Sequence, residues 1–321
     1  MADPLVLAEE GIDVVGGRMI LTDHPGASPL TGSPGPGHIW AGHIYVHRRI
    51  PVEPTRPPIV MIHGSNGTGM TFESTPDGRE GWATWFVRQG FSTYVVDHAG
   101  RGRSGFDPTS VNAARASGST GGLPNLFLGT AERLWVNTRI GPVYPEPFPG
   151  VRFPVEAFET FLALHVPNAE TTLAGGSENT IDGVCRLLDR IGPAILMVHS
   201  QGGLYGIEIA RRRPLLVTAL VSVEGGAEGV TPADVDRGLR RVRFLSVWGD
   251  NSFGAALVNG DERREGCARA VDVINSGGGD AALIMLPDMG ISGNTHAMMA
   301  DINNLDIASL ITTWLEAENP G

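Results

Sequence analysis

The chain has 321 residues, of which 41% are hydrophobic and 18% charged, so it can bury a sizeable core and is not globally disordered. Its formal net charge of −11 excludes nucleic acid as the expected partner and favours a neutral substrate over a strongly anionic one. No apolar run approaches the length of about 18 residues that a membrane span needs, and the absence of a signal-peptide pattern predicts a cytoplasmic protein, or a mature exported one that has lost its leader.

The first forty residues differ from the rest of the chain. Gly16 and Gly17 separate two short apolar runs, residues 12–15 and 18–21. A glycine pair in this setting is typical of the tight turn of a β-hairpin. Residues 24–38 are rich in proline and glycine. We therefore expect residues 1–40 to form a small hairpin followed by a loop.

Beyond this extension, short apolar runs alternate with segments that can form helices. Such alternation is typical of βαβ units and predicts an α/β fold with a mostly parallel, buried central sheet flanked by helices. The last helix is marked by apolar residues at a period near 3.6, from Ile302 to Trp314. The expected strands cover residues 43–50, 59–63, 92–97, 194–199, 219–224, 242–248 and 282–286, and the other expected helices cover residues 81–88, 179–190 and 202–213.

Residues 106–172 interrupt the alternation. This segment is rich in Gly, Pro, Asn and Ser, but it also carries scattered aromatic residues. A segment this long between two strands is either a lid over the sheet or disordered, and the aromatic residues favour an ordered lid. We therefore expect a core of residues 1–105 and 173–321 with residues 106–172 inserted as a lid whose aromatic side chains line an apolar pocket.

Ser200 stands where an expected strand meets an expected helix that opens with Gly202 and Gly203. This strand–turn–helix context is the one that a nucleophile elbow requires. The usual pattern is G-x-S-x-G, and here Val198 replaces the first glycine. The alternative is a serine that only caps the helix. We expect Ser200 to be the nucleophile, and a serine at this position indicates acyl transfer.

The loop after residues 59–63 is rich in glycine and begins with Gly64 and Ser65. In a hydrolase with such an elbow, this loop donates one backbone N–H to the developing oxyanion, and the residue after the nucleophile donates the second. We expect Ser65 and Gln201 to be these donors. His63 is expected to brace the loop by hydrogen bonds, and a loop that only connects strand and helix is the alternative reading.

Nine histidines are present, but only His296 lies late in the chain, before the last expected helix. The order serine, acid, histidine places the base in that position. A neutral imidazole with a pKa near about 6.5 can take the serine proton and return it to the leaving group. The alternative is a histidine that caps the last helix.

Two carboxylates compete as the orienting acid. The usual position after residues 242–248 is occupied by Ser252, and Asp250 lies two residues early. Glu224 ends the neighbouring expected strand, and adjacent strands lie about 4.8 Å apart, so a glutamate there can reach the same histidine. We expect Glu224 to be the acid and keep Asp250 as the alternative.

Taken together, these residues resemble the α/β-hydrolase superfamily, most closely a small group of bacterial carboxylesterases whose glutamate follows the sixth strand. The matching segments are residues 61–70, 95–106, 198–204, 221–227 and 293–316. The resemblance implies a Ser200, Glu224 and His296 triad with oxyanion donors Ser65 and Gln201, and it raises a homodimer as an option. Some relatives carry adjacent cysteines where this chain has Ser65 and Asn66. The segment from Asp97 to Ser104 is a superfamily feature that shapes a turn and is not catalytic.

We expect a serine carboxylesterase that cleaves a neutral small-molecule ester through an acyl-enzyme and needs no cofactor and no metal. A lactonase or an acyltransferase with the same triad is one alternative. A ligand-binding homologue without catalysis is the other, and it belongs to a different class of function. The two cysteines, Cys185 and Cys267, are expected to be free thiols.

Overall fold

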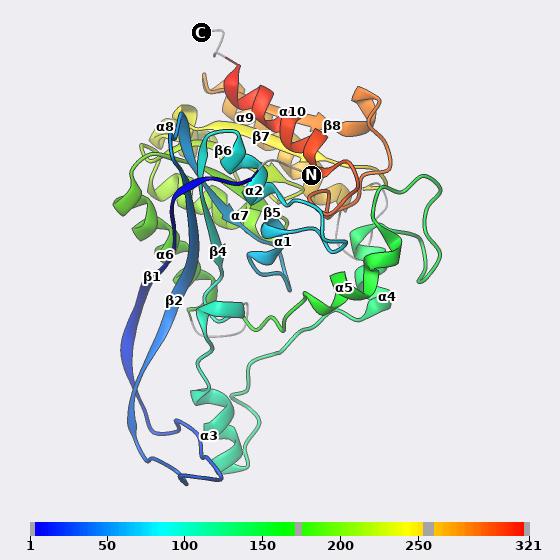
Figure 1. Ribbon diagram of the computed structural model, residues 1–321. Coiled ribbons are helices and arrows are strands. Elements are labelled where there is room, and N and C mark those ends of the chain that lie inside the picture. The colour runs from blue at the N-terminus through cyan, green and yellow to red at the C-terminus, as the bar shows by residue number, and fades with distance from the viewer. Residues whose placement is uncertain (1–3, 171–174, 253–259, 318–321) are drawn as a thin grey trace.

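The computed structural model describes residues 4–170, 175–252 and 260–317. Its centre is an eight-stranded sheet in the order β1-β2-β4-β3-β5-β6-β7-β8 (Figure 1). β1 pairs antiparallel with β2, and β2 antiparallel with β4, whereas the strands from β4 to β8 are all parallel. The strands are β1 (Leu7–Thr22), β2 (Gly37–Pro51), β3 (Arg56–Ile62), β4 (Phe91–Asp97), β5 (Ala194–His199), β6 (Val217–Val223), β7 (Arg243–Trp248) and β8 (Ala281–Met285).

The central strands are buried on both faces because helices cover both sides of the sheet. Alternate residues of one strand enter opposite cores: Val60 and Ile62 face one, and Ile59 and Met61 face the other. The first core is completed by helices α6 (Gly176–Ile191), α7 (Gly202–Arg212), α8 (Pro232–Arg237) and α9 (Gly260–Ser276). The second core is completed by α1 (Met70–Glu73), α2 (Trp82–Arg88) and α10 (Asn304–Glu316). The expected α/β architecture is therefore confirmed.

The segment from residue 106 to residue 170 has two parts. The first, α3 (Thr109–Ser117), lies against the far end of the β1–β2 hairpin (Figure 1), where Thr109 Oγ1 donates to Thr22 Oγ1 over 2.9 Å. The second contains α4 (Ala131–Thr138) and α5 (Phe158–Ala163), whose aromatic residues join the second core. Trp135 packs edge-to-face on Phe158, with ring centroids 4.9 Å apart. Short 3-10 turns η1 (Gly102–Ser104), η2 (Val155–Ala157), η3 (Leu239–Arg241) and η4 (Leu286–Met289) complete the chain.

The predicted position of the turn in the N-terminal hairpin is wrong. Gly16 and Gly17 lie within the single long strand β1, whose partner is β2, and the proline- and glycine-rich segment is the connection between them. Both glycines have positive φ, 72° and 74°, as does Gly42 on the facing strand, with φ 78°. A Cβ on Gly17 would lie 2.6 Å from the Trp40 indole nitrogen, so this glycine allows a close approach of two strands and not a reversal of the chain.

Candidate active site

Ser200 lies in the sharp turn between β5 and α7. Its φ of 52° is a left-handed conformation that a non-glycine residue rarely adopts. The turn is held by its neighbours: the Ser200 N–H donates to Val223 O over 3.1 Å, and the Gly203 N–H donates to Ser200 O over 2.9 Å. A Cβ on Gly202 would lie 2.9 Å from Ile62 O, so only glycine fits two residues after the serine. The backbone therefore has the geometry of a nucleophile elbow.

Val198 occupies the place of the first glycine of the usual elbow pattern. The structure accommodates its side chain because the facing residue of α7 is Gly206. A Cβ on Gly206 would lie 3.0 Å from Val198 Cγ1 and 2.7 Å from Leu220 Cδ1. In the usual pattern a glycine on the strand leaves room for the helix. Here Gly206 on α7 leaves room for the Val198 side chain, so valine at this position does not disturb the turn.

His296 lies in the loop between β8 and α10 and faces Ser200. Its Nε2 is 2.9 Å from Ser200 Oγ, and its Nδ1 is 2.7 Å from Glu224 Oε2. Two contacts fix the backbone of the histidine. Its N–H donates to Thr138 O over 2.9 Å, and its carbonyl accepts a 2.9 Å hydrogen bond from His199 Nε2. Three distant parts of the chain thus share one series of hydrogen bonds.

Glu224 follows β6 and, like Ser200, has a positive φ, 48°. Its Oε1 accepts a 2.8 Å hydrogen bond from the Gly249 N–H and a second from Arg139 Nη2, at the end of α4. The carboxylate and the Arg139 side chain are both buried. The alternative acid, Asp250, has a different task in the structure, because its Oδ2 accepts a 2.8 Å hydrogen bond from the Gly293 N–H.

The electrostatics favour an ionised acid and a neutral base. Burial alone would raise the pKa of Glu224, but the charge of Arg139 and the hydrogen bond from His296 hold it well below its usual range. Burial lowers the pKa of His296, against the opposing effect of Glu224. Burial and the adjacent His296 lower the pKa of His199 to about 3. At neutral pH, the imidazole next to Ser200 is therefore able to accept a proton.

Ser65 lies on the loop after β3, Gln201 directly follows Ser200 at the start of α7, and all three residues line one cavity. Neither backbone N–H donates a hydrogen bond to another group in the described parts of the chain. Gly64 packs directly against the elbow, since a Cβ on it would lie 2.9 Å from Ser200 Cβ. The loop is also tied to the 106–170 segment, because Asn66 Nδ2 donates to Phe127 O and to Val166 O over 2.7 and 3.0 Å.

A cavity of about 560 Å³ opens at Ser200 and His296. Its walls come partly from the 106–170 segment, with apolar Phe127, Leu134 and Phe161. The charged groups in its lining are balanced: Arg133 and Arg263 against Glu228 and Glu262. A small pocket of about 40 Å³ adjoins this cavity behind Ser65.

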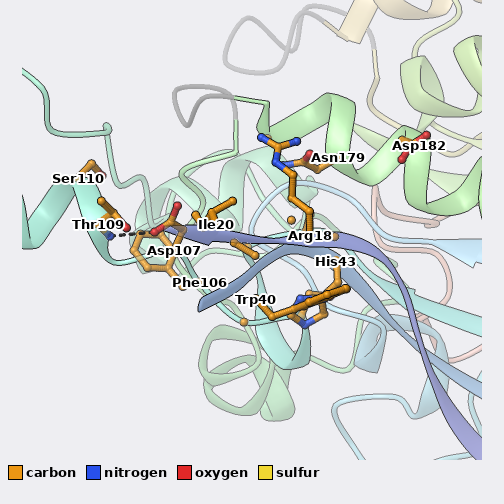
Figure 2. Close-up of a pocket in the computed structure, with 18 of the residues that line it drawn as sticks. Arg18, Ile20, Trp40, His43, Phe106, Asp107, Thr109, Ser110, Asn179 and Asp182 are labelled. Atoms are coloured by element: carbon orange, nitrogen blue, oxygen red, sulfur yellow. Dashed lines mark hydrogen bonds between the residues drawn. The ribbon is translucent and has the colours of Figure 1, made fainter. Parts of the chain in front are cut away.

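A second cavity of about 460 Å³ lies between the β1–β2 hairpin, the residues before α3, and α6 (Figure 2). It shares no lining residue with the cavity at Ser200. Two serines line this cavity. The Ser104 hydroxyl is tied to backbone groups, since it donates to Asp97 O and accepts from the Tyr45 N–H, and Ser110 Oγ has no hydrogen-bond partner, hence no histidine bonded to it, among the described residues. The histidine of this cavity, His43, has a buried Nδ1 with no hydrogen-bond partner among the described residues, so no carboxylate orients this ring through that atom. We therefore place the candidate active site at Ser200.

Within the described residues, no cluster of three His, Cys, Asp or Glu side chains could hold a metal ion. No helix in these residues is long and apolar enough to cross a membrane. Cys185 and Cys267 are buried free thiols, as expected.

Two residues of the site were not anticipated from the sequence, Arg139 and His199. Arg139 lies in the polar segment between β4 and α6, where no periodic pattern predicts a buried arginine. His199 precedes Ser200 in the chain, but adjacency alone does not indicate that its ring would bond to the backbone carbonyl of His296. Both roles arise from contacts between residues far apart in the chain.

No family model matches the chain. A solved structure described as a novel bacterial esterase is 37% identical, with a TM-score of 0.91, over 98% of this chain and 97% of that one. The chain belongs to the α/β-hydrolase superfamily. A curated relative of this α/β-hydrolase, a probable secreted lipase named phiG from a fungal species (strain ATCC 74256), is 29% identical over 86% of each chain.

Proposed function

We propose that this α/β-hydrolase is a serine carboxylesterase with Ser200 as nucleophile, His296 as base and Glu224 as the orienting acid. The observation that carries the proposal is the continuous series of contacts from Ser200 Oγ to His296 Nε2, 2.9 Å, and from His296 Nδ1 to Glu224 Oε2, 2.7 Å. The likeness to a bacterial esterase over nearly the full chain supports ester hydrolysis as the reaction.

In the first half of the reaction, Ser200 Oγ bonds to the ester carbonyl carbon while its proton passes to His296 Nε2. The carbonyl π electrons move onto oxygen, and the N–H groups of Ser65 and Gln201 receive this oxyanion. The intermediate then expels the alcohol, which takes the proton from His296. Glu224 accepts from Nδ1 throughout, which keeps Nε2 free for the proton and stabilises the imidazolium.

In the second half, His296 takes a proton from water, and the resulting hydroxide attacks the acyl-enzyme carbonyl. Collapse of the second tetrahedral intermediate breaks the bond to Ser200 Oγ, which regains its proton from His296. Each oxyanion donor is typically worth a factor of about 10² to 10³ in kcat. The balanced charges and apolar patches of the cavity support a neutral small-molecule ester as substrate.

We further propose that residues 106–172, of which 171 and 172 lie outside the described residues, act as a cover over the substrate, through their second part with α4 and α5. Support comes from Phe127, Leu134 and Phe161, which line the cavity at Ser200. The first part, with α3, packs on the hairpin and has no such role.

The decisive experiment combines labelling with turnover. A fluorophosphonate probe should label the wild-type protein at Ser200, and Ser200→Ala should abolish both labelling and cleavage of a p-nitrophenyl ester. Ser309→Ala, on the exposed side of α10, serves as the matched control and should behave as wild type. Unchanged turnover in the Ser200→Ala protein would refute the proposal.

Assembly and location stay predictions. The exposed apolar residues Ile12, Val14, Met19 and Leu21 on the edge strand β1 support the homodimer option, because an open strand edge with apolar side chains favours association. Light scattering of the purified chain would decide this point. Because the fungal relative is named as secreted, fractionation of cells that express the full-length gene is the check on the predicted cytoplasmic location.

A further inference from the structure

A buried arginine, Arg101, contacts both segments that carry the expected oxyanion donors, the loop after β3 and the start of α7. Arg101 is only 2% exposed. Its Nη1 donates to Gly64 O over 2.9 Å, and its Nη2 donates to Gln201 Oε1 over 2.7 Å. Gly64 and Gln201 flank the nucleophile from different elements. One guanidinium therefore joins the loop after β3 to the start of α7.

The contact with Gly64 fixes the orientation of the Ser65 N–H. The carbonyl of Gly64 and the N–H of Ser65 belong to one peptide group, which is planar and trans. In such a group, the C=O and N–H bonds point in opposite directions. When Arg101 holds the carbonyl toward the protein interior, the N–H must point the other way, toward the cavity that Ser65 and Ser200 line. Rotation of this peptide would remove the donor from the site.

His63 adds a second side-chain donor to the same carbonyl. Its Nδ1 lies 2.8 Å from Gly64 O, and its Nε2 accepts a 3.1 Å hydrogen bond from the His98 N–H. The second bond requires an unprotonated Nε2, so the ring is neutral and carries its proton on Nδ1, which donates to the carbonyl. The Gly67 N–H also donates to this oxygen over 3.3 Å, and together the three donors polarise the peptide and make the Ser65 N–H a stronger donor.

Arg101 is held in place by a buried partner. Its Nη2 also donates to Glu170 Oε2, and Glu170 accepts further hydrogen bonds from His98 Nδ1, 3.0 Å, and Thr180 Oγ1, 2.7 Å. Burial opposes ionisation, but His98 and Arg101 lower the pKa of Glu170 to about 2. The charge of the arginine is therefore neutralised by Glu170, and its two Nη atoms are hydrogen-bonded, whereas its Nε has no hydrogen-bond partner among the described residues.

We propose that Arg101, supported by His63 and Glu170, is the positioning residue of the oxyanion hole: it orients the Gly64–Ser65 peptide and ties it to Gln201. This role rests on the proposed esterase function. It differs from the contribution of Arg139, which contacts the acid. Arg101 does not line the cavity at Ser200, so it acts through the groups that it holds, the Gly64–Ser65 peptide and Gln201.

The test compares Arg101→Met and Arg101→Lys with wild type. Because an oxyanion donor acts on the transition state, we expect Arg101→Met to lower kcat by about 100-fold with KM within a factor of about two. The inhibition constant of a trifluoromethyl ketone, whose adduct with Ser200 places an oxyanion in the hole, should rise by about the same factor. Arg101→Lys keeps one donor and should recover part of both losses.

Arg243→Met is the matched control, because Arg243 also donates to backbone carbonyls, those of Leu315 and Trp314, but lies at the other end of the sheet from the site. It should lower the thermal midpoint without changing kcat or the inhibition constant. If Arg101→Met does not fold, Glu170→Gln tests the same point, since it removes the anchor of the guanidinium and should reduce kcat and inhibitor affinity together.

The proposal is overturned if folded Arg101 variants keep wild-type kcat, if only KM rises, or if kcat falls without a matching change in inhibitor affinity. A failure of the esterase function itself is a separate outcome, because the wild-type protein would then neither react with the fluorophosphonate probe nor cleave esters.

Discussion

Ser200 and Glu224 share an uncommon backbone feature, a positive φ at the carboxyl end of neighbouring parallel strands. In each case the residue leaves its strand through a strained turn. Such strain persists only where the surroundings enforce it. Here hydrogen bonds from the Ser200 N–H to Val223 O and from the Glu224 N–H to Val247 O enforce both turns. The strained turns bring both side chains to the same imidazole.

Substitution of the two carboxylates separates the acid from its alternative. Glu224→Gln leaves a side chain of equal size but favours the wrong tautomer of His296, so kcat should fall by about 10³- to 10⁴-fold. Asp250→Asn keeps an oxygen that can accept from the Gly293 N–H, so it should lower kcat by less than about tenfold. Steady-state kinetics at pH 8 on both variants provide the comparison. A larger loss for Asp250→Asn would assign the acid to Asp250.

The sequence was sufficient to propose Ser200, Glu224 and His296, because order along the chain and position at strand ends restrict the candidates. It was not sufficient for Arg101 and Arg139. Both are arginines in glycine-rich or polar segments, where an exposed side chain is the usual outcome. Arg101 is buried against Glu170 and Arg139 against Glu224. Each glutamate is distant in sequence from its arginine, so no local sequence pattern predicts the pairing.

At the scale of elements, α4 and the loop of the base form one unit. Thr138 O accepts from the His296 N–H, and Arg139 reaches Glu224 and, through Nε, Asp250 O. Further along, the Arg152 N–H donates to Gly293 O, and Arg152 O accepts from the Ile302 N–H. The inserted segment therefore contributes directly to the position of the base and to the charge of the acid.

This coupling predicts the pH dependence of an Arg139 variant. The charge of Arg139 lowers the pKa of Glu224 and adds to the effect of burial in lowering that of His296. The proposed mechanism needs an ionised Glu224 and a neutral His296. In Arg139→Met both pKa values rise, so the acidic limb of the kcat/KM profile should move to higher pH.

Loss of one partner of a buried pair also costs about 3–5 kcal/mol of stability, so the profile is measured well below the thermal midpoint of the variant. Arg139→Lys should shift the limb less. Arg186→Met, which breaks an exposed pair with Asp182, is the control and should leave the profile unchanged. An Arg139→Met profile identical to wild type would show that the ion pair does not influence the titration.

Most of the sheet was predictable because its central strands are continuous apolar runs. The hairpin and α9 were not. The glycine pair in β1 suits both a tight turn and a close crossing, and only the partner strand, more than twenty residues later, decides between them. In α9 the buried face consists mainly of small residues, Gly266, Cys267 and Ala270, which give a weak periodic signal.

For the molecule as a whole, buried neutral histidines predict loss of stability in mild acid. Burial is the main cause that lowers the pKa of His63, His98, His199 and His296. Unfolding exposes these rings, which then take up protons near pH 6.5. The stability that these rings contribute while neutral is complete above that pH. It declines as the pH falls toward the lowered pKa values of the rings in the folded protein. Each ring can lower the free energy of unfolding by up to about 1.4 kcal/mol for each pH unit of this fall.

Urea unfolding at pH 7.5, 6.5 and 5.5 measures this effect, and the midpoint should fall steeply between the last two values. Glu170 and Glu224, whose pKa values are lowered, add a second loss below about pH 4.5. Measurements at pH 7.5 and 8.5 are the control, because these rings are neutral in both states there. A constant midpoint down to pH 5.5 would contradict the expectation.

The contacts of Thr138 and Arg139 also bear on how this enzyme could be engineered. A segment that lines the cavity at Ser200 is an attractive unit to exchange between related enzymes. Here the exchange would remove the backbone anchor of His296 and the countercharge of Glu224 along with the wall itself. Point substitutions at Phe127 and Leu134, which line the cavity, offer a route to new selectivity that leaves both supports in place.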